Sequence, residues 1–205
     1  MKNSILKARA LMFVGLAAVL LFSVSGNAMA AAPDKLVKQT ADRVLAKVMA
    51  NKPTYQKNKR KLFSMVNAVV LPHFDFVVMS KRVLGKHWKK ASGAEKKAFV
   101  GAFKNLLVRT YATALLNYSG QKIEYKPAKI KKRTALVKTL VRNGGGAAIP
   151  INYRLYKSKS GKWKVYDLSV DSLRIVATYR TRYSAEIRRL GSVGKLVAWM
   201  RSGKA

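Results

Sequence analysis

The chain has 205 residues and no cysteine, and its hydrophobic content of 49% excludes a disordered polypeptide and suffices for a folded core. Its 42 lysines and arginines outnumber its 8 aspartates and glutamates so strongly that the formal net charge at pH 7 is +34. Such an excess attracts polyanions, which can be nucleic acid, anionic lipid headgroups or acidic proteins, although a generally solvated basic surface is the simpler alternative. Without cysteine we expect neither a disulfide nor a lipoprotein anchor, so the core must stabilise the chain unaided.

The first 30 residues have the features of a secretory signal peptide. A basic start with Lys2, Lys7 and Arg9 precedes an apolar run over residues 10–24, and Ala28-Met29-Ala30 places small residues at the −3 and −1 positions of a cleavage site. The apolar run is shorter than the ~20 residues with which a helix spans a bilayer. We therefore expect cleavage near Ala30.

The mature protein, residues 31–205, is expected to be a single domain that is soluble in the bacterial periplasm. Removal of the three basic residues of the leader lowers its net charge from +34 to +31. Export argues against nucleic acid as the partner, and the sequence contains no finger, RNP or leucine-zipper pattern. Anionic lipids and acidic proteins are the polyanions that we expect this chain to meet.

Residues from about 33 to 120 show helical periodicity. A first helix is predicted to begin near Pro33-Asp34, because proline and an acidic residue suit a first helical turn. Apolar or small side chains then recur at helical spacing and predict a buried face: Leu36, Val37, Thr40, Val44, Leu45 and Val48. After a break at residues 51–53, a second helix is predicted to end before Pro72.

The segment from Ser92 to Gly120 is the clearest helix in the sequence. Ser92 and Glu95 have the spacing of a capping box, and Gly120 allows a left-handed end. A helix of ~26 residues would be roughly 40 Å long. Its apolar stripe consists of Phe99, Phe103, Leu106, Leu107, Tyr111, Leu115 and Tyr118.

Residues from about 121 to 170 alternate as strands do. Four strands are predicted at 122–127, 134–142, 148–157 and 162–170, with short hairpins at Gly144–Gly146 and Ser158–Gly161. Helices are expected again from about 172 to 202. The fold class is therefore α+β, with an antiparallel sheet of about four strands wrapped by helices. Two strand faces are expected to be apolar: Ile149, Ile151, Tyr153 and Leu155 on one strand, and Tyr166, Leu168 and Val170 on the next.

Few residues suit catalysis or metal binding. The only histidines are His73 and His87, and the best constellation is His73 with Asp75, joined in space by Asp167. Because Asp75 stands at a predicted helix start, we favour a capping role over a general base or a metal ligand. No nucleotide-binding, serine-hydrolase or zinc motif occurs. We expect no enzyme activity, no catalytic residue, no metal and no cofactor.

The run from Pro72 to Trp88 resembles a hallmark of the MlaC family, the periplasmic phospholipid carriers of the lipid-asymmetry (Mla) pathway that are also called toluene-tolerance proteins. Further motifs match in the expected order over nearly the whole mature chain: Phe99, Phe103 and Leu106-Leu107; Thr110-Tyr111-Ala112, Ala114-Leu115 and Tyr118; Trp163 to Asp167; Tyr179-Arg180; and Gly191 with Leu196. One position departs from the family pattern, because Ser172 stands where a glycine is usual.

The resemblance implies a deep apolar pocket for acyl chains, a phosphate near its mouth, and shuttling between inner-membrane and outer-membrane Mla complexes without an ATPase of its own. Diacyl phospholipid is the expected cargo, and transient contact with a membrane surface is compatible with the charge. The residues that we expect to line the pocket are Phe74, Val77, Phe103, Leu107, Tyr111, Leu115, Ile151, Tyr153, Tyr166, Leu168, Leu173 and Val176. Arg180 or Arg154 is the expected partner of the phosphate.

Two alternatives stay open from the sequence. One is an envelope adaptor protein that binds acidic partners through its basic surface and has a filled core. The other is a small-pocket enzyme that uses His73 and Asp75.

Overall fold

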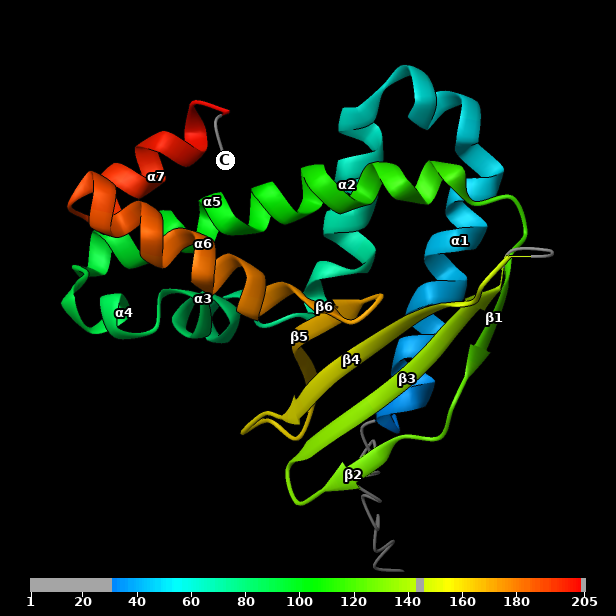
Figure 1. Cartoon of the computed structure of the whole chain (residues 1–205). Helices are drawn as coiled ribbons and strands as arrows, with labels where there is room; N and C mark the ends of the chain where they lie inside the picture. The colour runs from blue at the N-terminus through cyan, green and yellow to red at the C-terminus, as the bar shows by residue number, and fades with distance from the viewer. Residues whose placement is uncertain (1–30, 143–145, 204–205) are drawn as a thin grey trace, which may run out of the picture.

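The computed structural model describes residues 31–142 and 146–203 and places a helical first half and a C-terminal helix pair around one antiparallel sheet (Figure 1). The helices are α1 (Pro33–Lys57), α2 (Lys59–Val69), η1 (Leu71–His73, 3₁₀), α3 (Phe76–Leu84), α4 (Lys86–Lys90), α5 (Gly93–Ala112), η2 (Thr113–Asn117, 3₁₀), α6 (Ile175–Leu190) and α7 (Val193–Arg201). The strands are β1 (Lys122–Tyr125), β2 (Lys129–Lys131), β3 (Thr134–Arg142), β4 (Ile149–Lys157), β5 (Trp163–Val170) and β6 (Leu173–Arg174). The predicted signal peptide and residues 143–145 of the predicted glycine hairpin lie outside the described residues. Over the described ranges, no helix has the length and apolar character needed to cross a membrane.

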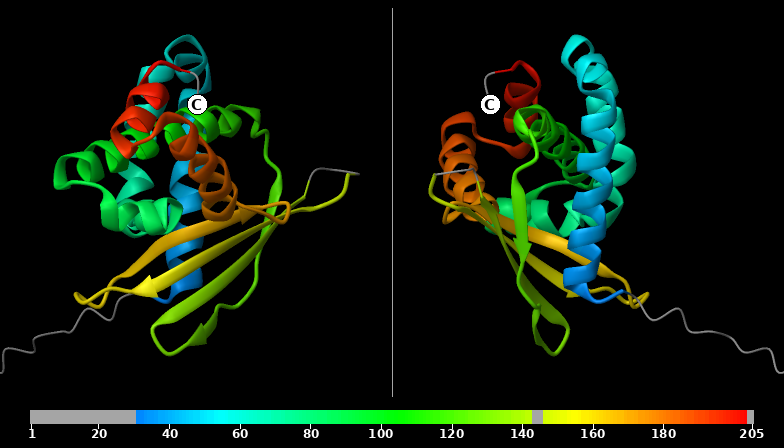
Figure 2. Two further views of the ribbon diagram at one scale, coloured as in Figure 1. Left: turned by 60° about the vertical axis from the view of Figure 1, so that its left-hand side comes forward. Right: turned by 90° about the vertical axis from the view of Figure 1, so that its right-hand side faces the viewer.

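The α+β class and the antiparallel sheet are confirmed. Strand order is β1-β3-β4-β5-β6, and β2 pairs with the far end of β3. Two short strands, β2 and β6, extend the four that the sequence predicted. Helix α1 crosses one face of the sheet, which we call the inner face, while α3 to α7 form a helical layer beside it (Figures 1 and 2).

The break predicted near Pro53 is a kink inside α1. Asn51 leaves the helical conformation with φ −130°, because the ring of Pro53 disrupts the hydrogen-bonding pattern of the preceding turn. Beside the kink, Lys52 Nζ donates to the Tyr118 carbonyl oxygen at 2.8 Å. This bond ties the upper part of α1 to the end of η2.

The capping box at the start of α5 is confirmed. Ser92 and Glu95 each accept a hydrogen bond from the backbone N–H of the other residue. Glu95 also accepts from Gly194 N at 2.8 Å, which joins α5 to the first turn of α7. The predicted length is wrong: the α-helix ends at Ala112 and tightens into the 3₁₀ turn η2, as helix C-termini often do.

A β-bulge in β5 overturns one predicted strand face. Arg154 pairs with Asp167 and Leu155 pairs with Val165, so Tyr166 has no partner on β4. One extra residue reverses the alternation of side chains from that point. Tyr166 therefore does not share a face with Leu168; its ring lies 4.4 Å from the Arg82 guanidinium.

Ser172, which stands where the MlaC pattern usually has a glycine, lies in a tight turn. Asp171 and Ser172 have φ values of 45° and 69° between paired Val170 and Leu173, so the two-residue β5–β6 hairpin is left-handed at both central residues. Glycine adopts this conformation without steric cost, whereas serine is strained in it.

Candidate functional site

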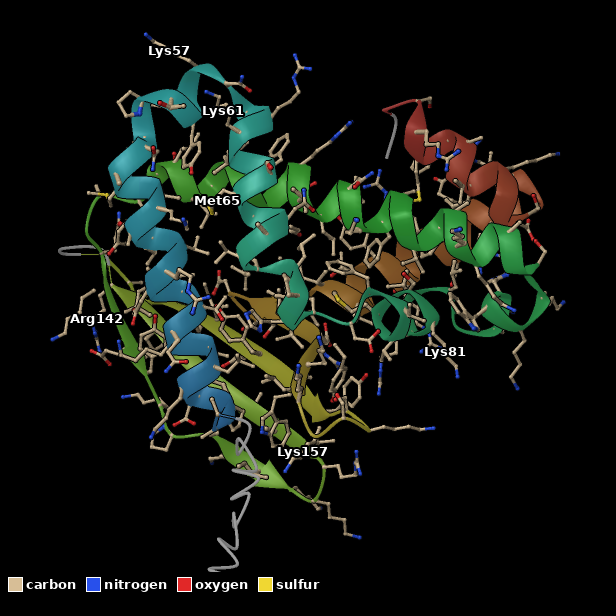
Figure 3. The ribbon with its side chains drawn as sticks, turned by 180° about the vertical axis from the view of Figure 1, so that it is seen from behind. Lys57, Lys61, Met65, Lys81, Arg142 and Lys157 are labelled. Carbon is tan, nitrogen blue, oxygen red and sulfur yellow. The ribbon has the colours of Figure 1, made fainter. Side chains whose placement is uncertain are left out.

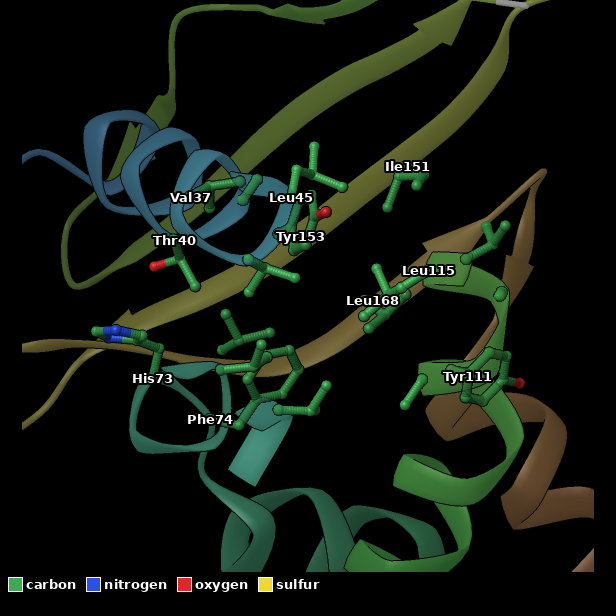
Figure 4. A pocket seen from close by; sticks show the side chains of 18 of the residues that line it. Val37, Thr40, Leu45, His73, Phe74, Tyr111, Leu115, Ile151, Tyr153 and Leu168 are labelled. Carbon is green, nitrogen blue, oxygen red and sulfur yellow. The ribbon is translucent and has the colours of Figure 1, made fainter. Parts of the chain in front are cut away.

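A cavity of about 650 Å³ lies between the inner face of the sheet, α1, and the C-terminal part of α5 (Figure 4). Protein interiors normally contain few voids larger than a water molecule, whereas binding pockets measure about 300–1,000 Å³. Thirty of the described residues line the cavity, and none of them is Asp, Glu, Lys or Arg. Its dimensions and lining are those of a site for an apolar ligand.

The cavity wall combines one face of a strand with one face of a helix. Alternate residues of β4, namely Ile149, Ile151 and Tyr153, point to the inner face and line the cavity. Opposite them, α1 presents its buried stripe, including Val37 and Val44. The cavity thus occupies the space where the helix and the sheet diverge.

The lining reaches the surface at one end. Tyr111 is 41% exposed and Ile149 is 37% exposed, and Ala114 and Asn117 beside them are exposed as well. These residues belong to the end of α5, to η2 and to the start of β4. We therefore place the opening between η2 and the first residues of β4.

His73, Tyr111 and Tyr153 of the lining are uncharged at neutral pH. Burial, followed by the positive charges of Lys164 and Arg43, holds the pKa of His73 below its ordinary value. Burial raises the pKa of Tyr153 to about 12, and burial together with the neighbouring Tyr179 raises the pKa of Tyr111 to about 12. A charged ligand group would find no counter-ion inside, so the cavity favours hydrocarbon.

The segment from Pro72 to Asp75 closes the cavity wall and is fastened to the sheet. Asp75 Oδ1 accepts from Val78 N at 2.9 Å and so caps α3, and Asp75 Oδ2 accepts from the Tyr156 hydroxyl. Asp75 N donates to the Val165 carbonyl oxygen at 2.9 Å. The predicted capping role of Asp75 is confirmed.

His73, Asp75 and Asp167 do not form one constellation. His73 lines the cavity, Asp75 uses its oxygens for the cap and for Tyr156, and Asp167 accepts from Arg174 at 2.7 Å and from Val176 N at 3.1 Å. No group of three metal-binding side chains occurs in the part of the chain that the structure describes. The catalytic trio considered from the sequence is therefore not assembled.

Seven of the twelve residues expected in the pocket lie on the cavity wall: Phe74, Leu107, Tyr111, Leu115, Ile151, Tyr153 and Leu168. The other five lie elsewhere. Phe103 and Val176 are buried in the helical core with Phe99, Tyr179 and Tyr183. Val77 and Leu173 are exposed, by 55% and 69%, and Tyr166 is displaced by the bulge.

The two arginines expected near a phosphate are also absent from the lining. Arg154 Nε lies 3.9 Å from the Asp167 carboxylate, and the Arg180 guanidinium lies against Gly85. Each is thus placed next to a structural partner away from the cavity.

The wall contains residues that the predicted list omitted. Those from α1, the end of α2 and η1 include Leu36, Val37, Thr40, Val44, Leu45, Val66, Leu71 and His73, and others come from α5, η2, β1, β3, β4, β5 and the start of α6. The signal for α1 was present, because its apolar stripe predicted a buried face. The sequence did not reveal that this face covers an open space.

Comparisons with known proteins point to one family. The model of the MlaC protein family matches residues 38–202. A Haemophilus influenzae protein, named intermembrane phospholipid transport system binding protein MlaC, is 30% identical over 152 residues, which are 72% of this chain and 71% of that protein. The toluene tolerance protein ttg2D of Pseudomonas putida is 30% identical over 162 residues, 78% of this chain and 75% of that protein.

A solved structure shares the architecture. It is a phospholipid-binding protein from Ralstonia solanacearum in complex with a phospholipid, and it is 32% identical with a TM-score of 0.78. The match covers 84% of this chain and 96% of that one.

Proposed function

The chain belongs to the MlaC family, as its motifs predicted, and we propose that it is a periplasmic phospholipid carrier that holds acyl chains in the cavity between α1 and the sheet. The observation that carries the proposal is the uncharged 650 Å³ cavity with an opening at one end. A bound phospholipid in the Ralstonia solanacearum structure, which has the same fold, supports it.

The physical need for such a cavity follows from the hydrophobic effect. Two acyl chains contain about thirty CH₂ groups, and each costs ~0.8 kcal/mol when it is exposed to water. Spontaneous desorption from a bilayer is therefore very slow, and a carrier must replace the bilayer core with an apolar wall of its own. The lining described above provides that wall.

The polar headgroup belongs at the opening. The interior offers no cation to a phosphate, so transfer of the phosphate past Tyr111 and Ile149 would cost its full desolvation energy. In the proposed complex the phosphate stays in the solvent at the end of η2 while the chains extend toward His73.

The name of the Haemophilus influenzae relative supports a role in transport between membranes. We propose that this chain exchanges phospholipid with inner-membrane and outer-membrane Mla complexes and that it uses neither a cofactor nor catalysis. Its leader-like first 30 residues fit export to the periplasm.

Native mass spectrometry of protein purified from a bacterial periplasm without detergent tests the proposal. The expected spectrum shows a mass excess that organic extraction resolves into diacyl phospholipid. A folded protein that carries no lipid, and that takes none from phospholipid vesicles, would refute it.

A further inference from the structure

The outer face of the sheet, opposite α1, carries a group of cations. Side chains of directly paired residues in an antiparallel sheet lie on the same face. Inner-face residues of β3, such as Val137 at 0% and Thr139 at 2% exposure, are buried. The intervening residues therefore point to the outer face, where Lys138 and Arg142 are exposed.

Strand pairing extends this group over β1 and β2. Lys122 pairs with Arg142, Lys129 pairs with Leu136, and Lys131 pairs with Thr134. Lys126 continues the β1 register, because its N–H donates to the Lys138 carbonyl oxygen at 2.9 Å. We call these six cations the basic sheet face: Lys122, Lys126, Lys129, Lys131, Lys138 and Arg142.

Few negative charges balance the basic sheet face. Glu124 shares it and is bound by Arg142 at 2.6 Å and by Lys126 at 3.5 Å. Lys122, Lys129, Lys131 and Lys138 make no ion pair with any residue of the described ranges. Figures 1 and 2 show that no helix within these ranges covers β2 and the adjoining parts of β3 and β4 on this side.

The basic sheet face adjoins the opening of the cavity. Arg142 ends β3 next to Val141, which pairs with Ile149 at the opening. Any surface that contacts the basic sheet face therefore lies beside the cavity opening, where a lipid would enter or leave.

We propose that the basic sheet face docks the carrier onto a bilayer that contains anionic phospholipid, with the opening beside that surface. This inference rests on the proposed function. Five of its six cations are lysines, whose flexible point charges suit mobile phosphates, whereas arginine's rigid fork favours fixed bidentate partners. Each cation near an anionic membrane raises the binding constant roughly fivefold.

The test measures co-sedimentation of the full mature protein with vesicles of phosphatidylcholine, with and without about one-third phosphatidylglycerol. The variant Lys129→Glu/Lys131→Glu/Lys138→Glu reverses three charges of the face. The control, Lys57→Glu/Lys59→Glu/Lys61→Glu, makes the same change in net charge at the tip of the α1–α2 hairpin. Figure 3 shows Lys57 and Lys61 at the far end of the molecule from the sheet.

The wild type is expected to bind the anionic vesicles and to release them as salt rises. Loss of three cations alone weakens binding about 100-fold, so the charge-reversed face variant is expected to bind more than about 100-fold more weakly. The control is expected to bind within about threefold of the wild type. Equal losses in both variants would overturn the proposal. Failure of the wild type to bind would also overturn it and would leave the face to an acidic protein.

Native mass spectrometry of the same samples separates this inference from the proposed function. Phospholipid retained in the face variant means that the cavity is intact whatever the vesicles show. A second variant with glutamine at the three positions removes charge without adding repulsion, and it is expected to lie between the wild type and the glutamate variant.

Discussion

Tyr156 on β4 donates a hydrogen bond to the carboxylate of Asp75, which also caps the first turn of α3. The two residues are 81 positions apart in sequence, and their bond joins the sheet to the segment that carries His73 and Phe74 into the cavity wall. Lys164 Nζ adds a parallel link by donating to the Pro72 carbonyl oxygen. The end of the cavity near His73 is thus held by polar bonds outside its apolar lining.

Replacement of Tyr156 by phenylalanine removes this donor and keeps the ring. Because the acceptor is a carboxylate in a partly buried position, we expect a loss of about 1–1.5 kcal/mol in the free energy of unfolding. Chemical denaturation measures it. Tyr166→Phe is the matched control, since the Tyr166 hydroxyl makes no hydrogen bond within the described ranges, and it should change stability by less than about 0.5 kcal/mol. Equal effects would contradict the role of the bond.

Asp167 anchors the start of α6. Its carboxylate is buried, accepts from Arg174 at 2.7 Å, and accepts from the backbone N–H of Val176 at 3.1 Å. Asp167→Asn removes the charge that both donors face, and we expect a destabilisation of about 2–3 kcal/mol, less than for a fully buried pair because Arg174 is half exposed. Thermal unfolding measures the change. Glu186→Gln breaks the exposed pair with Arg189 and should cost less than about 0.5 kcal/mol.

A larger side chain inside the cavity should compete with cargo. Ile151→Trp places an indole against the inner face of β4, and we expect a several-fold lower content of bound phospholipid with little loss of stability. Leu173→Trp makes a comparable change on the same sheet at a side chain that is 69% exposed, so its lipid content should match the wild type. Lipid extraction and quantification per mole of folded protein decide between them. Equal lipid content in both variants would argue against the cavity as the binding site.

His73 should make stability depend on pH. Its pKa is lowered in the folded state, chiefly by burial, so the folded chain binds fewer protons than the unfolded chain near and below pH 6.5. The contribution of His73 is complete above that pH and is lost as the pH falls, and His87 acts in the same direction. Between pH 7.5 and 5, His73→Gln should therefore lose less melting temperature than the wild type, and the double variant with His87→Gln should lose least. Parallel melting curves would contradict this prediction.

Short sequence motifs predicted those ends and breaks of helices that depend on neighbouring residues. The Ser92–Glu95 capping box, the cap at Asp75 and the kink at Pro53 each follow from residues a few positions apart. The family resemblance added the functional hypothesis, which composition and periodicity alone did not provide.

Tertiary packing determined which of the predicted apolar residues line the cavity. Phe103 and Leu107 lie on one apolar stripe of α5, yet Phe103 is buried against Tyr179 and Tyr183 while Leu107 faces the cavity. The bulge at Tyr166 moved that ring off the expected face, because a single unpaired residue reverses alternation. The spacing of apolar residues along a helix or a strand predicts neither outcome.

At Ser172 the structure supplies a physical reason that the sequence alone did not give. The resemblance indicated a glycine position, and the structure gives the reason in the positive φ of the β5–β6 turn. Leu173, which follows, projects from this turn with its side chain exposed and away from the cavity.

The most direct test of the central claim is photo-crosslinking with a phospholipid whose acyl chain carries a diazirine near its end. Mass spectrometry of the digested protein then locates the attached chain. The account predicts adducts on the cavity wall, in the peptides that contain Leu107 to Leu115 and Ile149 to Tyr153, and fewer of them in Ile151→Trp. Adducts confined to α7 or to the basic sheet face would contradict it, because the acyl chain would then lie outside the cavity.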